Sequence, residues 1–107
     1  MIDNTTLETL HTSLTGEVLF DKLHQTLYAT DASVYRKIPL AVAFPKDTKD
    51  LKILIEFATK NNITLIPRTA GTSLAGQCVG DGIVVDVSKY FTNIISFDET
   101  LKTITLE

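Results

Sequence analysis

The sequence is short of cysteine, of basic charge and of long apolar runs, and each shortage excludes a class of protein. One cysteine cannot form an internal disulfide, so nothing suggests an oxidising compartment. Ten Lys and Arg against 13 Asp and Glu give a net charge of −3, without the basic excess that binding to a nucleic-acid backbone demands. No apolar run approaches the roughly 18 residues of a membrane span, and the N-terminus lacks the basic-then-apolar order of a signal peptide.

The chain of 107 residues is 44% hydrophobic and 21% charged, which suffices for one compact core and excludes a disordered segment. We expect a small α/β (α+β) domain that is cytoplasmic or peripheral at the inner membrane, with no transmembrane segment and no nucleic-acid partner. Residues 94–97 and 101–106 predict an antiparallel hairpin. The last residues alternate like a half-buried strand and stop without turn residues, so we interpret the chain as part of a longer polypeptide.

The N-terminal region predicts a helix followed by a segment with two readings. Three leucines share one stripe of a helix over about residues 6–14. Thr5 and Glu8 have the spacing of a capping box at its start, and Gly16 is expected to end it. Residues 18–20 and the leucines after them predict either a short strand or another helical turn, and the sequence does not separate the two.

A strand, a helix and a second strand follow in the order of a βαβ unit. Residues 40–44 predict a strand buried on both faces, and residues 63–66 predict a second strand that Pro67 stops. The helix between them is capped by Asp47 or Thr48, and its apolar residues recur with helical spacing as far as the Asn-Asn pair. This order predicts two parallel strands joined by a right-handed crossover.

The loop PRTAGTSLAGQ, residues 67–77, carries the chemistry. It follows the carboxyl end of a parallel strand, where open α/β sheets bind their ligands, and a third apolar run at 83–87 comes after it. Gly71 and Gly76 permit positive φ angles and close approach of the backbone to a ligand. Successive N–H groups in such turns form an anion site, to which Arg68 and the hydroxyls add donors, and their spread suits a diphosphate. The plain alternative is a connecting loop with turn glycines.

Two common phosphate-binding loops are excluded by their spacing. Gly71 and Gly76 have the glycine spacing of a P-loop, with four residues between them. A P-loop then requires Lys followed by Ser or Thr, whereas Gln and Cys follow Gly76 in this sequence. A Rossmann fingerprint opens a long helix, whereas this loop runs through residues 80–82 into another strand. A ligand of this loop is therefore bound on a different fold.

The loop and three further segments, in the same order, resemble the flavoprotein superfamily that includes vanillyl-alcohol oxidase and p-cresol methylhydroxylase. Within it, the resemblance is to the D-lactate dehydrogenase and glycolate oxidase branch. The three further segments are residues 28–39, 41–51 and 82–88. The resemblance implies the first subdomain of an FAD-binding domain of the p-cresol methylhydroxylase (PCMH) type at 28–107, after a helical segment at 1–27. Its fold is a small parallel βαβ sheet with flanking helices and a C-terminal hairpin.

The resemblance also implies which residues bind the cofactor. In the family, this loop holds the diphosphate of FAD mainly through backbone N–H groups. The corresponding residues are Arg68, Thr69, Ala70, Gly71, Thr72, Ser73, Leu74, Gly76 and Gln77. Thr69 and Ala70 stand where the family often has glycine, which restricts φ there. No His lies within the loop, so the flavin is expected to be noncovalent, and catalytic residues are expected beyond this chain.

For the full-length protein, the resemblance implies an FAD-dependent dehydrogenase or oxidase of a D-2-hydroxy acid, of the D-lactate or glycolate type. The flavin would take a hydride from this small substrate and pass electrons to an acceptor, and the fragment alone is expected to be inactive. Cys-rich runs further along the polypeptide would add an iron–sulfur cluster. Two alternatives stay open: a reductase of the same superfamily, and a non-catalytic domain that binds a phosphate ligand or a partner chain.

Four other polar residues are interpreted as structural. Cys78 is read as a buried thiol, and His11 and His24 as solvated or capping groups, since a metal site needs ligands that this chain lacks. Asp86 lies in an apolar strand and is read as a buried, hydrogen-bonded carboxylate or as a marker of the strand's solvated face.

Overall fold

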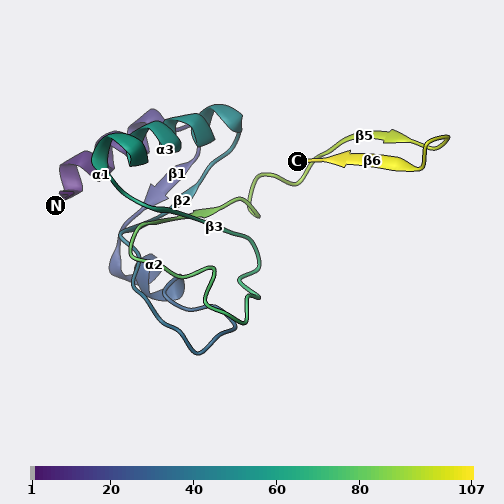
Figure 1. Ribbon diagram of the computed structural model, residues 1–107. Coiled ribbons are helices and arrows are strands. Elements are labelled where there is room, and N and C mark those ends of the chain that lie inside the picture. The colour runs from purple at the N-terminus through teal and green to yellow at the C-terminus, as the bar shows by residue number, and fades with distance from the viewer. Residues whose placement is uncertain (1) are drawn as a thin grey trace.

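The computed structural model describes residues 2–107 as a four-stranded sheet with helices on both faces and a separate two-stranded hairpin (Figure 1). The strand order is β1-β2-β4-β3. The strands are β1 (Glu17–Leu19), β2 (Ala41–Phe44), β3 (Leu65–Arg68) and β4 (Ile83–Asp86). β4 pairs in parallel with both β2 and β3, and β1 pairs antiparallel with β2. The predicted parallel strands are confirmed, with β4 inserted between the two strands of the βαβ unit.

Each of the three helices begins at an aspartate. The helices are α1 (Asn4–Ser13), α2 (Lys22–Leu27) and α3 (Thr48–Asn61). The carboxylates of the caps Asp3, Asp21 and Asp47 accept hydrogen bonds from backbone N–H groups of the first turn. The predicted end of α3 is confirmed, since Asn62 adopts a left-handed φ of 53°. Over residues 2–107, no helix is long and apolar enough to cross a membrane.

The start predicted for α1 is wrong, whereas its predicted end near residue 14 is confirmed, with Leu14 as the C-cap. Asp3 caps the helix through a 2.8 Å hydrogen bond from Thr6 N, so the helix starts before the expected Thr5–Glu8 capping box. It ends at Ser13, ahead of Gly16. The two readings of the next segment both apply in turn, because β1 ends at Leu19 and α2 begins at Lys22.

The second predicted strand is displaced by two residues, and this displacement matters for the site. β3 continues through Pro67, which was expected to stop it, and ends at Arg68. Because β3 is an edge strand, the missing N–H of the proline is tolerated there. The shift makes Arg68 the register partner of Asp86, the last residue of β4.

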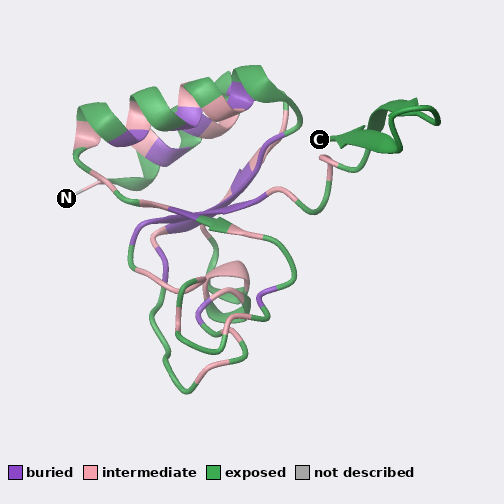
Figure 2. Cartoon of the chain, turned by 45° about the vertical axis from the view of Figure 1, so that its right-hand side comes forward, coloured by how far each residue is buried: buried purple, intermediate pink, exposed green. Residues whose placement is uncertain are grey.

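The apolar core lies between the sheet and the pair α1 and α3, whose buried faces point at the strands (Figure 2). The predicted leucine stripe is confirmed, since Leu7, Leu10 and Leu14 are all buried. They pack with Leu54 of α3 and with alternate residues of the strands. The opposite face of the sheet carries α2 and the two long loops, residues 28–40 and 69–82 (Figure 1).

The predicted C-terminal hairpin is confirmed as β5 (Ile94–Asp98) and β6 (Thr103–Leu106), which pair antiparallel. Every residue of both strands is exposed, as Figure 2 shows, so the expected half-buried pattern is wrong within this chain. The hairpin extends away from the sheet and exposes apolar side chains such as Phe97 and Leu106.

Asp50, in the first turn of α3, is fully buried, which the sequence did not predict. Its carboxylate accepts hydrogen bonds from Thr15 N and Gly16 N, each at 2.8 Å, and from Lys46 N at 2.9 Å. Burial by itself would raise the pKa of this carboxyl, but these backbone donors outweigh it and hold the pKa below its ordinary value. The ionised side chain therefore joins the start of α3 to the turn between α1 and β1.

The lowered pKa of Asp50 makes the fold sensitive to acid. A carboxyl whose pKa is lower in the folded than in the unfolded state adds stability above its unfolded pKa of about 3.9. This stability is lost as the pH falls through the folded pKa. We expect the urea midpoint of the wild-type chain to be flat near neutral pH and to fall below about pH 4. In Asp50→Asn the midpoint should be lower near neutral pH and depend less on acid, so that the two proteins converge as the pH falls. An equal acid dependence in both proteins would contradict this role.

Candidate functional site

The last residues of the three parallel strands meet at Tyr28. The Tyr28 ring packs edge-to-face on Phe44 of β2, with 5.9 Å between ring centroids. Its hydroxyl donates to Asp86 Oδ2 of β4 at 2.6 Å. The Arg68 guanidinium of β3 lies over its face, 5.0 Å from the centroid. Tyr28 therefore fixes the end of α2 to the carboxyl ends of the strands, where the predicted loop begins.

Asp86 is buried and hydrogen-bonded, which confirms the first of its two readings. Its Oδ1 accepts from Ser88 N at 2.8 Å and from Ser88 Oγ at 2.6 Å, while Oδ2 accepts from Tyr28. Burial first, and then the hydrogen bond to Asp86, raise the pKa of Tyr28 to about 12. The phenol therefore stays protonated and keeps donating to this carboxylate at physiological pH.

Removing the Tyr28 hydroxyl is expected to weaken this junction. In Tyr28→Phe, the buried Asp86 loses one of its donors, and we expect a loss of about 1–2 kcal/mol in the free energy of unfolding. Tyr35→Phe is a matched control, because that side chain is 60% exposed and should change stability by less than about 0.5 kcal/mol. Urea unfolding of both variants checks the difference, and equal losses would contradict the assigned role of Tyr28.

Arg68 bridges the two long loops. Its Nη1 donates to the carbonyl oxygen of Thr30 at 2.7 Å and to that of Cys78 at 3.4 Å. The loops also contact each other directly, through Ala32 N donating to the Gly71 carbonyl at 3.0 Å and Cys78 N donating to Asp31 Oδ2 at 3.4 Å. The guanidinium group therefore lies between the two loops, and the sequence did not predict its partners.

Both predicted loop glycines have positive φ, 67° at Gly71 and 72° at Gly76. A Cβ on Gly71 would lie 2.5 Å from Arg68 Nη2, and one on Gly76 would lie 2.7 Å from Cδ2 of Tyr35. Both contacts are too short for real Cβ atoms, and the positive φ angles add strain for any other residue, so glycine suits these two turns. The loop is thereby bent closely around Arg68 on one side and against Tyr35 on the other.

The bend leaves a run of backbone N–H groups without partners. Within the described residues 2–107, the N–H groups from Thr69 through Leu74 donate to no protein acceptor. By contrast, Ser73 Oγ accepts from Ala75 N at 3.3 Å and Gln77 N at 3.2 Å, and the same hydroxyl pairs with Gln77 Oε1 at 3.0 Å. The first half of the loop therefore offers free backbone N–H donors, while its second half is stabilised by hydrogen bonds to the Ser73 hydroxyl.

This arrangement fits an anionic group such as a diphosphate. Unpaired N–H groups on a turn with a left-handed glycine form a concave donor site for phosphate oxygens. Without a side chain at Gly71, the loop packs closely against the Arg68 guanidinium group. The predicted residues Arg68 through Gln77 thus lie on one continuous loop at the carboxyl end of the sheet, with Arg68 and Ser73 already hydrogen-bonded within the protein.

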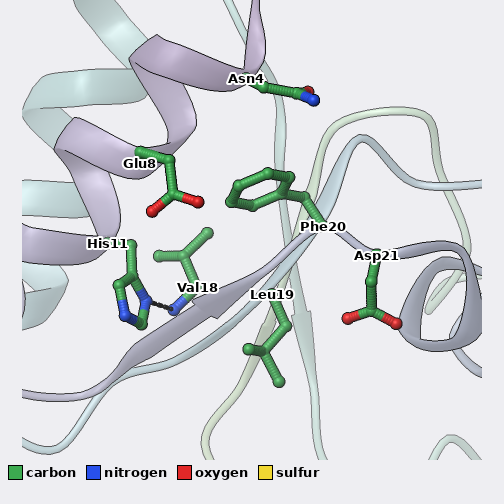
Figure 3. Close-up of a pocket in the computed structure, with 7 residues that line it drawn as sticks. All are labelled: Asn4, Glu8, His11, Val18, Leu19, Phe20 and Asp21. Carbon is green, nitrogen blue, oxygen red and sulfur yellow. Dashed lines mark hydrogen bonds between the residues drawn. The ribbon is translucent and has the colours of Figure 1, made fainter.

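A hollow lies elsewhere, against α1 and β1 (Figure 3), and does not involve the predicted site. Its volume is about 410 Å³, and Glu8, Phe20 and Asp21 are among its lining residues. His11 lines it too and accepts a hydrogen bond from Val18 N at Nδ1, 3.0 Å away, as expected of a capping group. β1 and β3 are the opposite edges of the sheet, so this hollow is separated from the loop. No cluster of metal-ligating side chains occurs in the described part of the chain.

Comparison with known proteins agrees with this geometry. Residues 39–107 match the FAD binding domain family. The chain is 35% identical over 96 residues to the D-2-hydroxyglutarate dehydrogenase of Pseudomonas putida, covering 86% of this chain and 10% of that protein. It is 33% identical over 73 residues to the mitochondrial D-lactate dehydrogenase [cytochrome] 1 of Saccharomyces cerevisiae, covering 64% of this chain and 12% of that protein. The chain thus spans about a tenth of the length of these curated relatives.

Solved structures share the fold at low sequence identity. An alkyldihydroxyacetonephosphate synthase superposes with a TM-score of 0.78 at 15% identity, covering 94% of this chain and 23% of the other. Physcomitrella patens BBE-like 1 superposes with a TM-score of 0.71 at 18% identity, covering 88% of this chain and 21% of the other. The fold, the position of the loop and the family match lead to one conclusion: the chain belongs to the family of FAD binding domains.

Proposed function

We propose that the loop binds the diphosphate of FAD. The run of unpaired backbone N–H groups from Thr69 through Leu74 is the observation that carries this proposal. Gly71 and Gly76 allow close approach, and the membership in the FAD binding domain family identifies the nucleotide. The full set of proposed FAD-binding residues is Arg68, Thr69, Ala70, Gly71, Thr72, Ser73, Leu74, Gly76 and Gln77.

We propose further that the flavin is held without a covalent bond at this loop. No His occurs between Arg68 and Gln77, so the loop has no imidazole to attach the isoalloxazine ring. Acid precipitation of the full-length protein should release the yellow colour into the supernatant. Colour that stays in the washed pellet would contradict noncovalent binding.

We infer that the full-length protein is an FAD-dependent oxidoreductase of a D-2-hydroxy acid. The bound flavin supplies a hydride acceptor, and the protein supplies binding and orientation. The relatives named as D-2-hydroxyglutarate and D-lactate dehydrogenases support this substrate class. D-2-hydroxyglutarate, D-lactate and glycolate are therefore the substrates to compare, and the proposal includes a separate electron acceptor.

Anaerobic reduction of the flavin tests this function. Full-length protein loaded with FAD should lose its visible flavin absorbance when one of these 2-hydroxy acids is added, and the L-enantiomers of lactate and 2-hydroxyglutarate should leave it unchanged. Adding an artificial electron acceptor should restore the absorbance. Retention of FAD without bleaching by any of these acids would contradict the dehydrogenase proposal while leaving the cofactor site intact. Failure to bind FAD would instead favour a domain for another phosphate ligand.

The route of the electrons and the location of the protein are also proposals. An iron–sulfur cluster further along the polypeptide would relay electrons from the flavin, and iron analysis of the purified full-length protein tests for it. Cell fractionation tests whether the protein is cytoplasmic or attached to the inner membrane. Iron in the purified protein together with recovery in the membrane fraction would support electron transfer to a membrane acceptor.

A further inference from the structure

Arg68 is the only proposed FAD-binding residue with a permanent charge, yet its guanidinium group is engaged within the protein. Nη1 donates to the carbonyl oxygens of Thr30 and Cys78, which belong to the two different loops. The face of the group lies over the Tyr28 ring at 5.0 Å. The Tyr28 ring is itself held by its 2.6 Å hydrogen bond to Asp86. The orientation of the guanidinium group is therefore fixed from several sides without any ligand.

The loop is shaped around this group. Gly71 lies so close to it that a Cβ would be 2.5 Å from Nη2 and 2.9 Å from Cζ. The Gly71 carbonyl faces the other loop, where it accepts from Ala32 N at 3.0 Å. Because a trans peptide unit directs its C=O and its N–H to opposite sides, this contact turns the N–H of Thr72 away from Ala32 and its loop. The Ala32–Gly71 contact, beside the Arg68 guanidinium group, thus sets the direction of the Thr72 N–H group.

We propose that Arg68 is a positioning residue, which holds the loop in the shape that presents its N–H groups, and that this role outweighs direct neutralisation of the diphosphate. This inference rests on the proposed FAD site. It follows that, for FAD binding, the planar shape of the guanidinium group and its forked arrangement of N–H donors matter more than its charge. A lysine keeps the charge, but its single ammonium group has neither the planar face that stacks on Tyr28 nor the rigid fork that bridges two loops.

The test compares Arg68→Lys, Arg68→Met and the control Lys37→Met in the full-length protein. Lys37 lies on the neighbouring loop and pairs with Asp81 at 3.0 Å, so its replacement removes one charge from the same region without touching the fork. For each variant, the Kd for FAD is measured by flavin fluorescence at several salt concentrations, on protein that circular dichroism shows to be folded. Hydrogen exchange of the Ala32 amide, whose partner is the Gly71 carbonyl, is measured without FAD.

We expect Arg68→Lys and Arg68→Met to weaken FAD binding by about tenfold or more each, and to within about threefold of one another. Lys37→Met should change the Kd by less than about twofold, and the salt dependence of binding should be the same in all proteins. The Ala32 amide should exchange about tenfold faster in both Arg68 variants than in the wild type.

Three results would overturn the inference. The first is wild-type affinity for FAD in Arg68→Lys together with a large loss of affinity, and a weaker dependence of the Kd on salt, in Arg68→Met. This result would show that Arg68 acts by neutralising the charge of the diphosphate directly. Lower melting temperatures with unchanged FAD affinity of the folded variants would show a role in stability alone. Unchanged exchange of the Ala32 amide would show that Arg68 does not hold the loop. If the wild type binds no FAD, the proposed function fails, and the exchange measurement alone decides the role of Arg68.

Discussion

Gly71→Val in the full-length protein is expected to yield folded protein without FAD. The residue has a φ of 67°, which a β-branched side chain adopts only with strain. Its Cβ would also lie 2.5 Å from Arg68 Nη2, so the loop would have to move away from the guanidinium group. Because the neighbouring N–H groups would move with it, we expect FAD affinity to fall by about a hundredfold or more. The ratio of flavin to protein after gel filtration measures this loss.

Asn62→Val is the matched control for Gly71→Val. It places the same side chain at a similar positive φ of 53°, but in the turn after α3, at the opposite end of β3 from the loop. The backbone strain should lower stability by about 1–2 kcal/mol, as at Gly71, and leave the flavin content near that of the wild type. If Gly71→Val retained a full complement of FAD, the assignment of the loop would be wrong. If both variants lost FAD equally, general destabilisation would explain the result.

Asp50→Ala is expected to be the most destabilising single change away from the loop. It removes the buried carboxylate that accepts from the N–H groups of Thr15, Gly16 and Lys46. Loss of a buried carboxylate that accepts several charge-assisted hydrogen bonds costs about 3–5 kcal/mol, a large part of the stability of a small domain. Urea unfolding followed by circular dichroism measures the change.

Asp47→Asn provides the comparison for Asp50→Ala. Asp47 caps the same helix, its side chain accepts from Asp50 N at 2.9 Å, and asparagine caps helices about as well as aspartate. The expected change is less than about 1 kcal/mol. A loss as large as that of Asp50→Ala would mean that the start of α3 is sensitive to any change, and a small loss in Asp50→Ala would mean that its carboxylate is dispensable.

The elements that the sequence predicted are those set by neighbouring residues. The apolar run before Pro45, the spacing of apolar residues in α3 and the turn at Asn62 are all local features, and the structure confirms them. Gly71 and Gly76 were expected to adopt positive φ because little but glycine suits a tight anion-binding turn, and both do. This one loop therefore predicts the position and type of the candidate site, and the binding role of its residues stays a prediction.

The features that the sequence did not predict depend on residues far apart along the chain. The burial of Asp50 depends on the turn at Thr15 and Gly16, which lies about 35 residues earlier in the chain. Arg68 was expected to serve a ligand, but its carbonyl partner at Thr30 comes from a segment 38 residues away. Pro67 was expected to stop a strand, but β3 continues through it. The sequence did not predict this, because the edge position that tolerates a proline follows only from the strand order of the whole sheet.

Hydrogen exchange of the loop amides, with and without FAD, tests the central claim most directly. The claim is that the backbone N–H groups from Thr69 through Leu74, which lack partners within the described chain, donate to the diphosphate of FAD. Saturating FAD should slow exchange of several of these amides in the full-length protein by about tenfold or more. It should leave the amide of Asn62, at the other end of β3, unchanged. Bound FAD with unaltered exchange throughout Thr69 to Leu74 would contradict the account.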